Sequence, residues 1–201
     1  ALDGAFLADP ANNPGQDTLT LSMRVERGGK VLRLDFPTDS DLPGGGPGRA
    51  SNGNFAISEL EVLDGASPVK LTAAWANATE GAWGPWQTID GIADKSDNLW
   101  NPQAHLHQRR TLLALMENPA KPYSKLTARL ICWSQWGQHV PGCLRAAVLP
   151  DETTASDVGL VANAQLQGAK SAKFSWWDTT YCPRIALMDS EGRAVACENK
   201  P

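Results

Sequence analysis

Apolar and polar residues alternate along seven short runs of this sequence, and clusters of Gly, Pro, Asn and Asp separate one run from the next. A period of two places successive side chains on opposite faces of a strand, so the pattern predicts strands with one buried face. The expected strands cover residues 18–26, 31–36, 55–63, 69–76, 111–116, 125–133 and 143–149. No segment shows a convincing amphipathic helix, so we expect an all-β chain folded as an antiparallel β-sandwich.

The third of these runs changes phase in its middle. The apolar residues concerned are Phe55, Ile57, Leu60 and Val62, and the change falls between the second and the third. We expect all four in the core, with a β-bulge near Ser58 that shifts the alternation by one residue.

The composition argues against two classes of partner. The 201 residues carry a net charge of −4, with an isoelectric point near 5.4, and no cluster of Lys or Arg that would bind nucleic acid. No apolar run approaches the ~20 residues that cross a bilayer, so we expect no membrane span. Hydrophobic residues make up 42% of the chain, which is enough for a packed core.

The residue pattern changes after Pro150, where a polar connection leads into further strand-like segments. We therefore expect a sandwich over residues 1–150 and a β-rich extension over residues 151–201, which ends in a β-hairpin with "DSEG" as its turn. A segment of ~50 residues is at the lower limit for independent folding. The extension is thus expected to pack on the sandwich or on a neighbouring subunit.

The four cysteines form two local pairs in the sequence. Cys132 and Cys143 bracket one expected hairpin and Cys182 and Cys197 another, so we predict a disulfide within each pair, out of three connectivities. Zinc is the alternative, but ten and fourteen intervening residues do not suit a zinc knuckle. No C-x-x-C-H motif is present, so we expect no covalent haem. Disulfides imply a secreted or cell-surface protein.

Four segments carry a more specific pattern: "LDGAFLADPANNPGQDTLTLSMRV", "VLRLDFPTDSDLPGGGPGRASNGNFAISELEV", "WQTIDGIADKSDNLW" and "SKLTARLICWSQWGQHVPGCLRAAV". In this order they resemble a discoidin- or galactose-binding-like module of large secreted bacterial proteins that also carry cytochrome-c domains. The resemblance covers about residues 1–150 and is strongest at "LPGGGPGR" and "NGNF". It implies a jelly-roll-like sandwich, carbohydrate binding through loops at one end, and often a structural calcium ion beside them; the implied function is analogy, because a fold does not fix a function.

Tryptophans in turns are the first candidate binding residues, because indole stacks on the C–H faces of sugar rings. The motif "WGPW" holds Trp83 and Trp86 in a turn, and "WSQWGQH" places Trp136 at a hairpin tip with His139 close by. We predict these four residues as ligand contacts. For the last two, a scaffolding role in the loop is the alternative. Trp100 is assigned to the core.

The loop "LPGGGPGRASNGN" contributes three further candidates, Arg49, Asn52 and Asn54. Their side chains can hydrogen-bond sugar hydroxyls. They can equally tie down the backbone of the loop itself, as Asn and Arg do in long ordered loops. Both alternatives stay open from the sequence.

Asp90, Asp94 and Asp97 cluster in "DGIADKSD". Calcium takes roughly six to eight oxygen ligands, which often come from carboxylates on short loops. The three aspartates are therefore a candidate calcium site, and ordinary turn chemistry is the alternative.

No motif identifies an enzyme. Glycoside hydrolysis needs two positioned carboxylates, and serine hydrolases of one large class carry G-x-S-x-G, neither of which can be located here. The sequence therefore predicts a non-catalytic extracellular module that binds carbohydrate or another polymer. The alternative is a structural subunit of an extracellular fibre or surface layer that self-associates through residues 151–201.

Overall fold

The computed structural model describes residues 5–9, 12, 14–102 and 107–150, together with the backbone of three strands at 175–177, 184–188 and 194–197. The chain divides into two compact units, Ala1–Leu149 and Pro150–Pro201.

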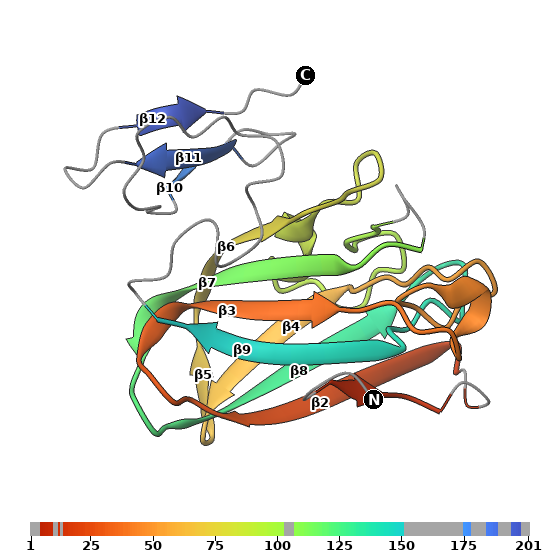
Figure 1. The fold of residues 1–201 in the computed structure, drawn as a ribbon, viewed down its shortest axis with the longest axis horizontal. Coiled ribbons are helices and arrows are strands. Elements are labelled where there is room, and N and C mark those ends of the chain that lie inside the picture. Colours follow the sequence, from red (N-terminus) through yellow and green to blue (C-terminus); the bar gives the residue numbers. More distant parts are fainter. Residues whose placement is uncertain are drawn as a thin grey trace. The chain divides into compact units, whose positions relative to one another are not determined.

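Nine strands of the first unit form two antiparallel sheets (Figure 1). The five-stranded sheet has the order β1-β9-β3-β7-β6, and the four-stranded sheet has the order β2-β8-β4-β5. The strands are β1 (Phe6–Leu7), β2 (Gln16–Arg24), β3 (Gly29–Phe36), β4 (Glu59–Asp64), β5 (Ser67–Val69), β6 (Leu71–Ala76), β7 (Arg110–Ala120), β8 (Lys125–Trp133) and β9 (Cys143–Leu149).

Helical structure in the described residues is limited to two 3-10 turns, η1 (Pro43–Gly45) and η2 (Pro85–Thr88). The predicted all-β sandwich is confirmed. Within the described part of the chain, no helix has the length and apolar character needed to cross a membrane.

One hydrophobic core lies between the two sheets. Alternate residues of β8 (Leu126, Ala128 and Leu130) face it from the four-stranded sheet, as the period of two requires. The facing residues of β3 in the five-stranded sheet are Leu32, Leu34 and Phe36. Near the ends of the strands, the rings of Phe36, Phe55 and Trp100 contact one another with centroids 4.6 to 5.7 Å apart, so the core position predicted for Trp100 is confirmed.

The third predicted strand is shorter than its sequence pattern. Phe55, Ile57, Leu60 and Val62 are all buried in the core, as expected, but the strand begins only at Glu59. The register of β4 with β8 is regular, so the predicted bulge is not part of the strand. Ser58 lies at the change of phase, between the isolated bridge of Ile57 to Trp100 and the first pair of β4 with β8. Its hydroxyl donates to the carbonyl of Trp133 at 2.6 Å and accepts from the Trp133 backbone N–H at 3.0 Å.

The second unit contains β10 (Ser175–Trp177), β11 (Arg184–Met188) and β12 (Ala194–Cys197). They form a three-stranded antiparallel sheet in the order β10-β11-β12. Because β11 and β12 are consecutive and paired, the predicted C-terminal hairpin is confirmed. The predicted disulfide between Cys182 and Cys197 lies outside the described side chains.

The predicted disulfide between Cys132 and Cys143 is wrong. Both are free cysteines, each with 2% of its surface exposed. The prediction assumed that β8 and β9 form a hairpin, whereas they belong to different sheets. Cys132 faces the core and Cys143 pairs with Leu7 of β1 at the edge of the five-stranded sheet.

Both thiols are expected to be unreactive in the folded protein, because burial raises the pKa of Cys132 and of Cys143 and so suppresses the thiolate. In a variant with Cys182→Ser and Cys197→Ser, a thiol reagent should label neither cysteine under native conditions and both in denaturant without reductant. If the reagent labelled neither cysteine in denaturant, the two would be joined by a disulfide after all.

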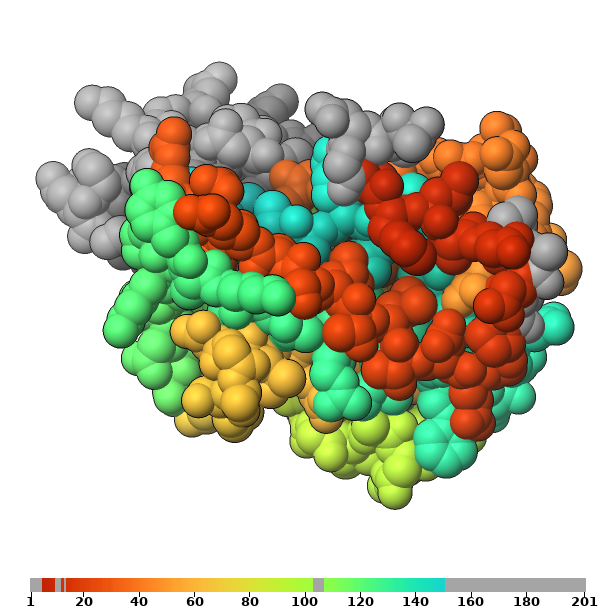
Figure 2. All heavy atoms as spheres, turned by 90° about the horizontal axis from the view of Figure 1, so that it is seen from below, coloured from red at the N-terminus to blue at the C-terminus, as the bar shows by residue number. Residues whose placement is uncertain are grey.

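The two ends of the sandwich differ in their connections (Figure 1). At one end, β3, β6 and β8 lead into long segments, 37–58, 77–109 and 134–142, from which β4, β7 and β9 emerge. At the other end, short turns join neighbouring strands. We call these the loop end and the turn end. Figure 2 shows the molecule from the side on which β2 crosses the surface as the edge strand of its sheet.

Candidate functional site

Three long segments at the loop end are hydrogen-bonded to one another through their backbones. Ala56 donates to the carbonyl of His139 at 2.9 Å, Ile57 to that of Trp100 at 3.1 Å, and Gln135 to that of Ser96 at 3.0 Å. Because each segment is tied to another, their side chains are held on a common support.

Glycines allow the segment 42–58 to cross itself at close range. A Cβ atom on Gly48 would lie 1.9 Å from the carbonyl oxygen of Asn54, and one on Gly46 would lie 2.3 Å from that of Gly53. A third glycine, Gly53, has φ of +80°, which a side chain would disfavour. The glycine-rich loop is therefore a compact fold of backbone against backbone rather than a flexible link.

Arg49 and Asn54 lie inside this loop and are both 3% exposed. Arg49 hydrogen-bonds the carbonyl of Asn12 and pairs with Asp17 at 3.1 Å, and the amide of Asn54 donates to Asn101 at 2.9 Å. The ligand-binding role predicted for these two residues does not fit, because buried side chains with internal partners present no surface. Asn52 is exposed, but its side chain accepts from the backbone of Asn54.

Three of the four predicted aromatic residues meet at the loop end. Trp83 and Trp136 pack edge to face with ring centroids 5.1 Å apart and planes at 86°. His139 lies 5.6 Å from Trp136, which remains 42% exposed. We call Trp83, Trp136 and His139 the aromatic cluster. It joins the segment 77–109 to the segment 134–142.

The tight turn 134–138 presents Trp136. The backbone N–H of Trp136 donates to the Ser134 hydroxyl at 3.1 Å, and Gly137 and Gln138 both have positive φ. The fourth aromatic residue, Trp86, has a different environment: its ring covers Gly84 so closely that a Cβ there would meet it at 1.9 Å. Trp86 is thus partly used in fixing the "WGPW" turn.

The three aspartates predicted to bind calcium do not form a metal-binding group. All are exposed, and the described residues contain no set of three His, Cys, Asp or Glu side chains placed to hold a metal ion. Asp90 instead accepts from the backbone of Ile92 at 3.0 Å and from the side chain of Asn98. This is ordinary turn chemistry, and calcium at this loop stays a prediction without support from the carboxylates.

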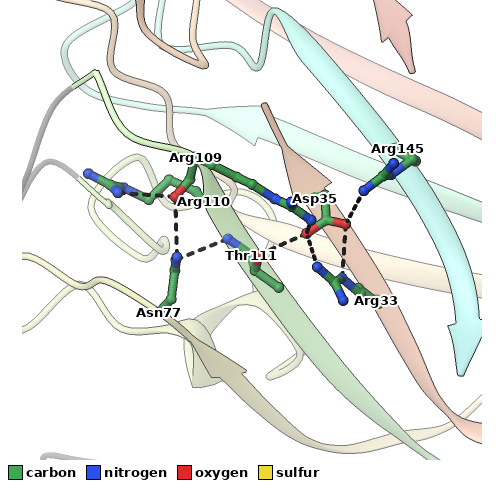
Figure 3. A network of polar contacts seen from close by, with 7 residues as sticks. All are labelled: Arg33, Asp35, Asn77, Arg109, Arg110, Thr111 and Arg145. Carbon is green, nitrogen blue, oxygen red and sulfur yellow. Dashed lines mark hydrogen bonds and ion pairs between the residues drawn. The ribbon is translucent and has the colours of Figure 1, made fainter. Parts of the chain in front are cut away.

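A charged network that the sequence did not indicate lies on the outer face of the five-stranded sheet (Figure 3). Asp35 on β3 is 3% exposed and contacts Arg33, Arg109 and Arg145 at 2.9, 2.7 and 3.2 Å. The hydroxyl of Thr111 adds a hydrogen bond at 2.8 Å. Burial alone would raise the pKa of Asp35, but the hydrogen bonds from Arg109, Arg33 and Thr111 outweigh it and lower the pKa to about 2.

A groove on the other sheet contains a second unusual carboxyl group. Glu59, Glu61, Lys70, Ile89 and Arg129 are among its lining residues. Glu59 is 7% exposed and accepts from the Gly91 N–H at 3.0 Å. Burial and the nearby charge of Asp90 raise its pKa to about 7, against the opposing hydrogen bond from Gly91.

No protein-family model matches the chain, and no curated protein or solved structure matches it.

Proposed function

We propose that this protein is a non-catalytic extracellular module that binds carbohydrate or another polymer through the aromatic cluster. The observation that carries the proposal is the half-exposed indole of Trp136, which is fixed at a right angle to Trp83 and lies beside His139. Such a surface offers an apolar platform for a sugar ring and an imidazole for its hydroxyl groups.

The rigidity of the support favours binding. Ordering a loop on association costs free energy, and a loop that is already tied to its neighbours avoids much of that cost. The segments that carry Trp83 and Trp136 are hydrogen-bonded to the rest of the loop end. The resemblance of residues 1–150 to a galactose-binding-like module, whose relatives use loops at one end, agrees with this location and with a position outside the cytoplasm.

The variant Trp136→Ala tests the proposal, because it removes the most exposed ring of the cluster. We expect affinity for the bound polymer to fall by at least about tenfold, equivalent to ~1.4 kcal/mol. Affinity electrophoresis through gels that contain xylan, galactan, dextran, dextran sulfate or polygalacturonate measures the effect.

Tyr123→Ala is the matched control. Tyr123 is 69% exposed and lies in the short turn between β7 and β8 at the turn end, so its loss should leave retardation in the gel unchanged. Equal effects of the two variants, or no retardation of the wild type by any polymer, would contradict the proposal.

The alternative is a structural subunit that assembles through its C-terminal strands. It is favoured by the small sheet β10-β11-β12, in which two of three strands are edges and so carry unpaired backbone groups that a neighbouring chain can bind. Sedimentation velocity at increasing protein concentration separates the two proposals, because a monomer at all concentrations rules out assembly.

A further inference from the structure

The network around Asp35 contains more positive than negative charge. Three guanidinium groups share one carboxylate. Three positive charges therefore meet at one negative charge, in a protein whose net charge is −4.

The three arginines are not equivalent. Arg33 makes two parallel hydrogen bonds to both oxygens of Asp35, at 2.9 and 3.0 Å, and only 14% of its side chain is exposed. Together with Thr111 it already satisfies the buried carboxylate. Arg109 and Arg145 each add a single Nη2 contact, on opposite oxygens, and their side chains are 46% and 42% exposed.

These two exposed arginines are held in place before any ligand arrives. A free arginine side chain loses rotamer entropy when a ligand fixes it, and the contact with Asp35 has already restricted these two side chains before a ligand binds. Figure 3 shows Arg109 and Arg145 approaching the carboxylate from two sides. Their other N–H groups can donate charge-assisted hydrogen bonds to an anion.

We propose that Arg109 and Arg145 bind a sulfate ester or carboxylate group, and that the polymer ligand is therefore an acidic polysaccharide. This inference rests on the proposed function. The site adjoins the loop end, because β3 leads into a long segment there and β7 and β9 begin there. Nucleic acid fits less well, since a dense line of phosphates would be repelled by the net charge of −4, whereas sulfate or carboxylate groups spaced along a sugar chain suit a local pair of arginines.

The test is the double variant Arg109→Gln/Arg145→Gln, compared with the wild type on polygalacturonate and dextran sulfate and on their neutral counterparts, galactan and dextran. We expect the wild type to bind one or both acidic polymers at least about tenfold more tightly than the neutral ones, and salt to weaken this binding. The double variant should lose that preference and keep its binding to neutral polymer. The acidic polymer that responds identifies the group, carboxylate or sulfate.

Arg129→Gln is the matched control, because Arg129 has a side chain 43% exposed and forms one ion pair, with Glu61, on the other sheet. It should leave the preference intact. Arg145→Gln alone, which keeps Arg33 and Arg109 on Asp35, serves if the double variant does not fold, and it should reduce the preference by several fold. Equal binding of acidic and neutral polymers, or equal loss in the Arg129 control, overturns the anion site alone. No binding to any polymer overturns the proposed function as well.

Discussion

Replacing Gly48 by alanine is expected to destabilise the protein by about 3 kcal/mol or more. The added Cβ would lie 1.9 Å from the carbonyl oxygen and 2.3 Å from the carbonyl carbon of Asn54, and no rotamer change relieves a clash with backbone. The loop would have to open where Gly48 also pairs with Pro141. Overpacking in a closed site costs about 1–3 kcal/mol even when side chains can adjust. Urea unfolding measures the change.

Gly15→Ala is the control for this experiment. No atom lies within 4 Å of a Cβ built on Gly15, and the position is exposed, so its unfolding free energy should change by less than about 0.5 kcal/mol. If Gly48→Ala were as mild, the crossing of the two backbone segments in the glycine-rich loop would be wrong.

Glu59→Gln is expected to stabilise the protein at alkaline pH by about 3 kcal/mol. The pKa of Glu59 rises from 4.5 to about 7 on folding, and each pKa unit corresponds to ~1.36 kcal/mol. Between these two values the folded state holds a proton that the unfolded state has lost, so stability falls as pH rises from 4.5 to 7 and the full cost is present above 7. Glutamine carries no charge and can still accept from Gly91.

The measurement is urea unfolding of both proteins at pH 4, 6 and 8. The difference should be near zero at pH 4 and largest at pH 8. Glu117→Gln is the control, since Glu117 is exposed and pairs with Lys70 at the surface, where an ion pair contributes less than about 1 kcal/mol. Parallel stability curves for the wild type and Glu59→Gln would show that the buried carboxyl is not the source of the pH dependence.

The strands and the core could be predicted because they depend on local pattern. Alternation placed β8 and β9 at their observed bounds, and it assigned Phe55, Ile57 and Leu60 to the core although the strand there begins late. A period of two reports which face is buried whatever the partner strand is.

Pairing between strands could not be predicted in the same way. The disulfide between Cys132 and Cys143 failed because the sequence does not tell a hairpin from a connection between two sheets. The Asp35 network could not be predicted for the same reason. Only Arg33 and Asp35 share one strand, with a spacing of two that puts them on one face. Arg145 lies on β9 and Arg109 directly precedes β7. Both strands flank β3 in the sheet but are far from it in the sequence.

The aromatic cluster could be predicted only in part. Residue type and turn motifs singled out Trp83, Trp136 and His139 separately, and the backbone hydrogen bonds of the loop end bring them into contact. Arg49 and Asn54 carried an equally polar signal but lie inside the loop. Residue type alone does not show which polar side chains of a long loop will hydrogen-bond within the loop and so be buried.

The turn end is a suitable place to attach this protein to a surface. Asp64 at the end of β4 and Gly65 and Ala66 in the turn to β5 are all exposed, and the space around Gly65 is open. Such tips tolerate insertions well. A biotin-acceptor peptide placed there would tether the protein to a biosensor chip with the loop end, which carries Trp136, directed away from the chip and the arginine pair on the uncovered side, so that each variant would be compared in one fixed orientation.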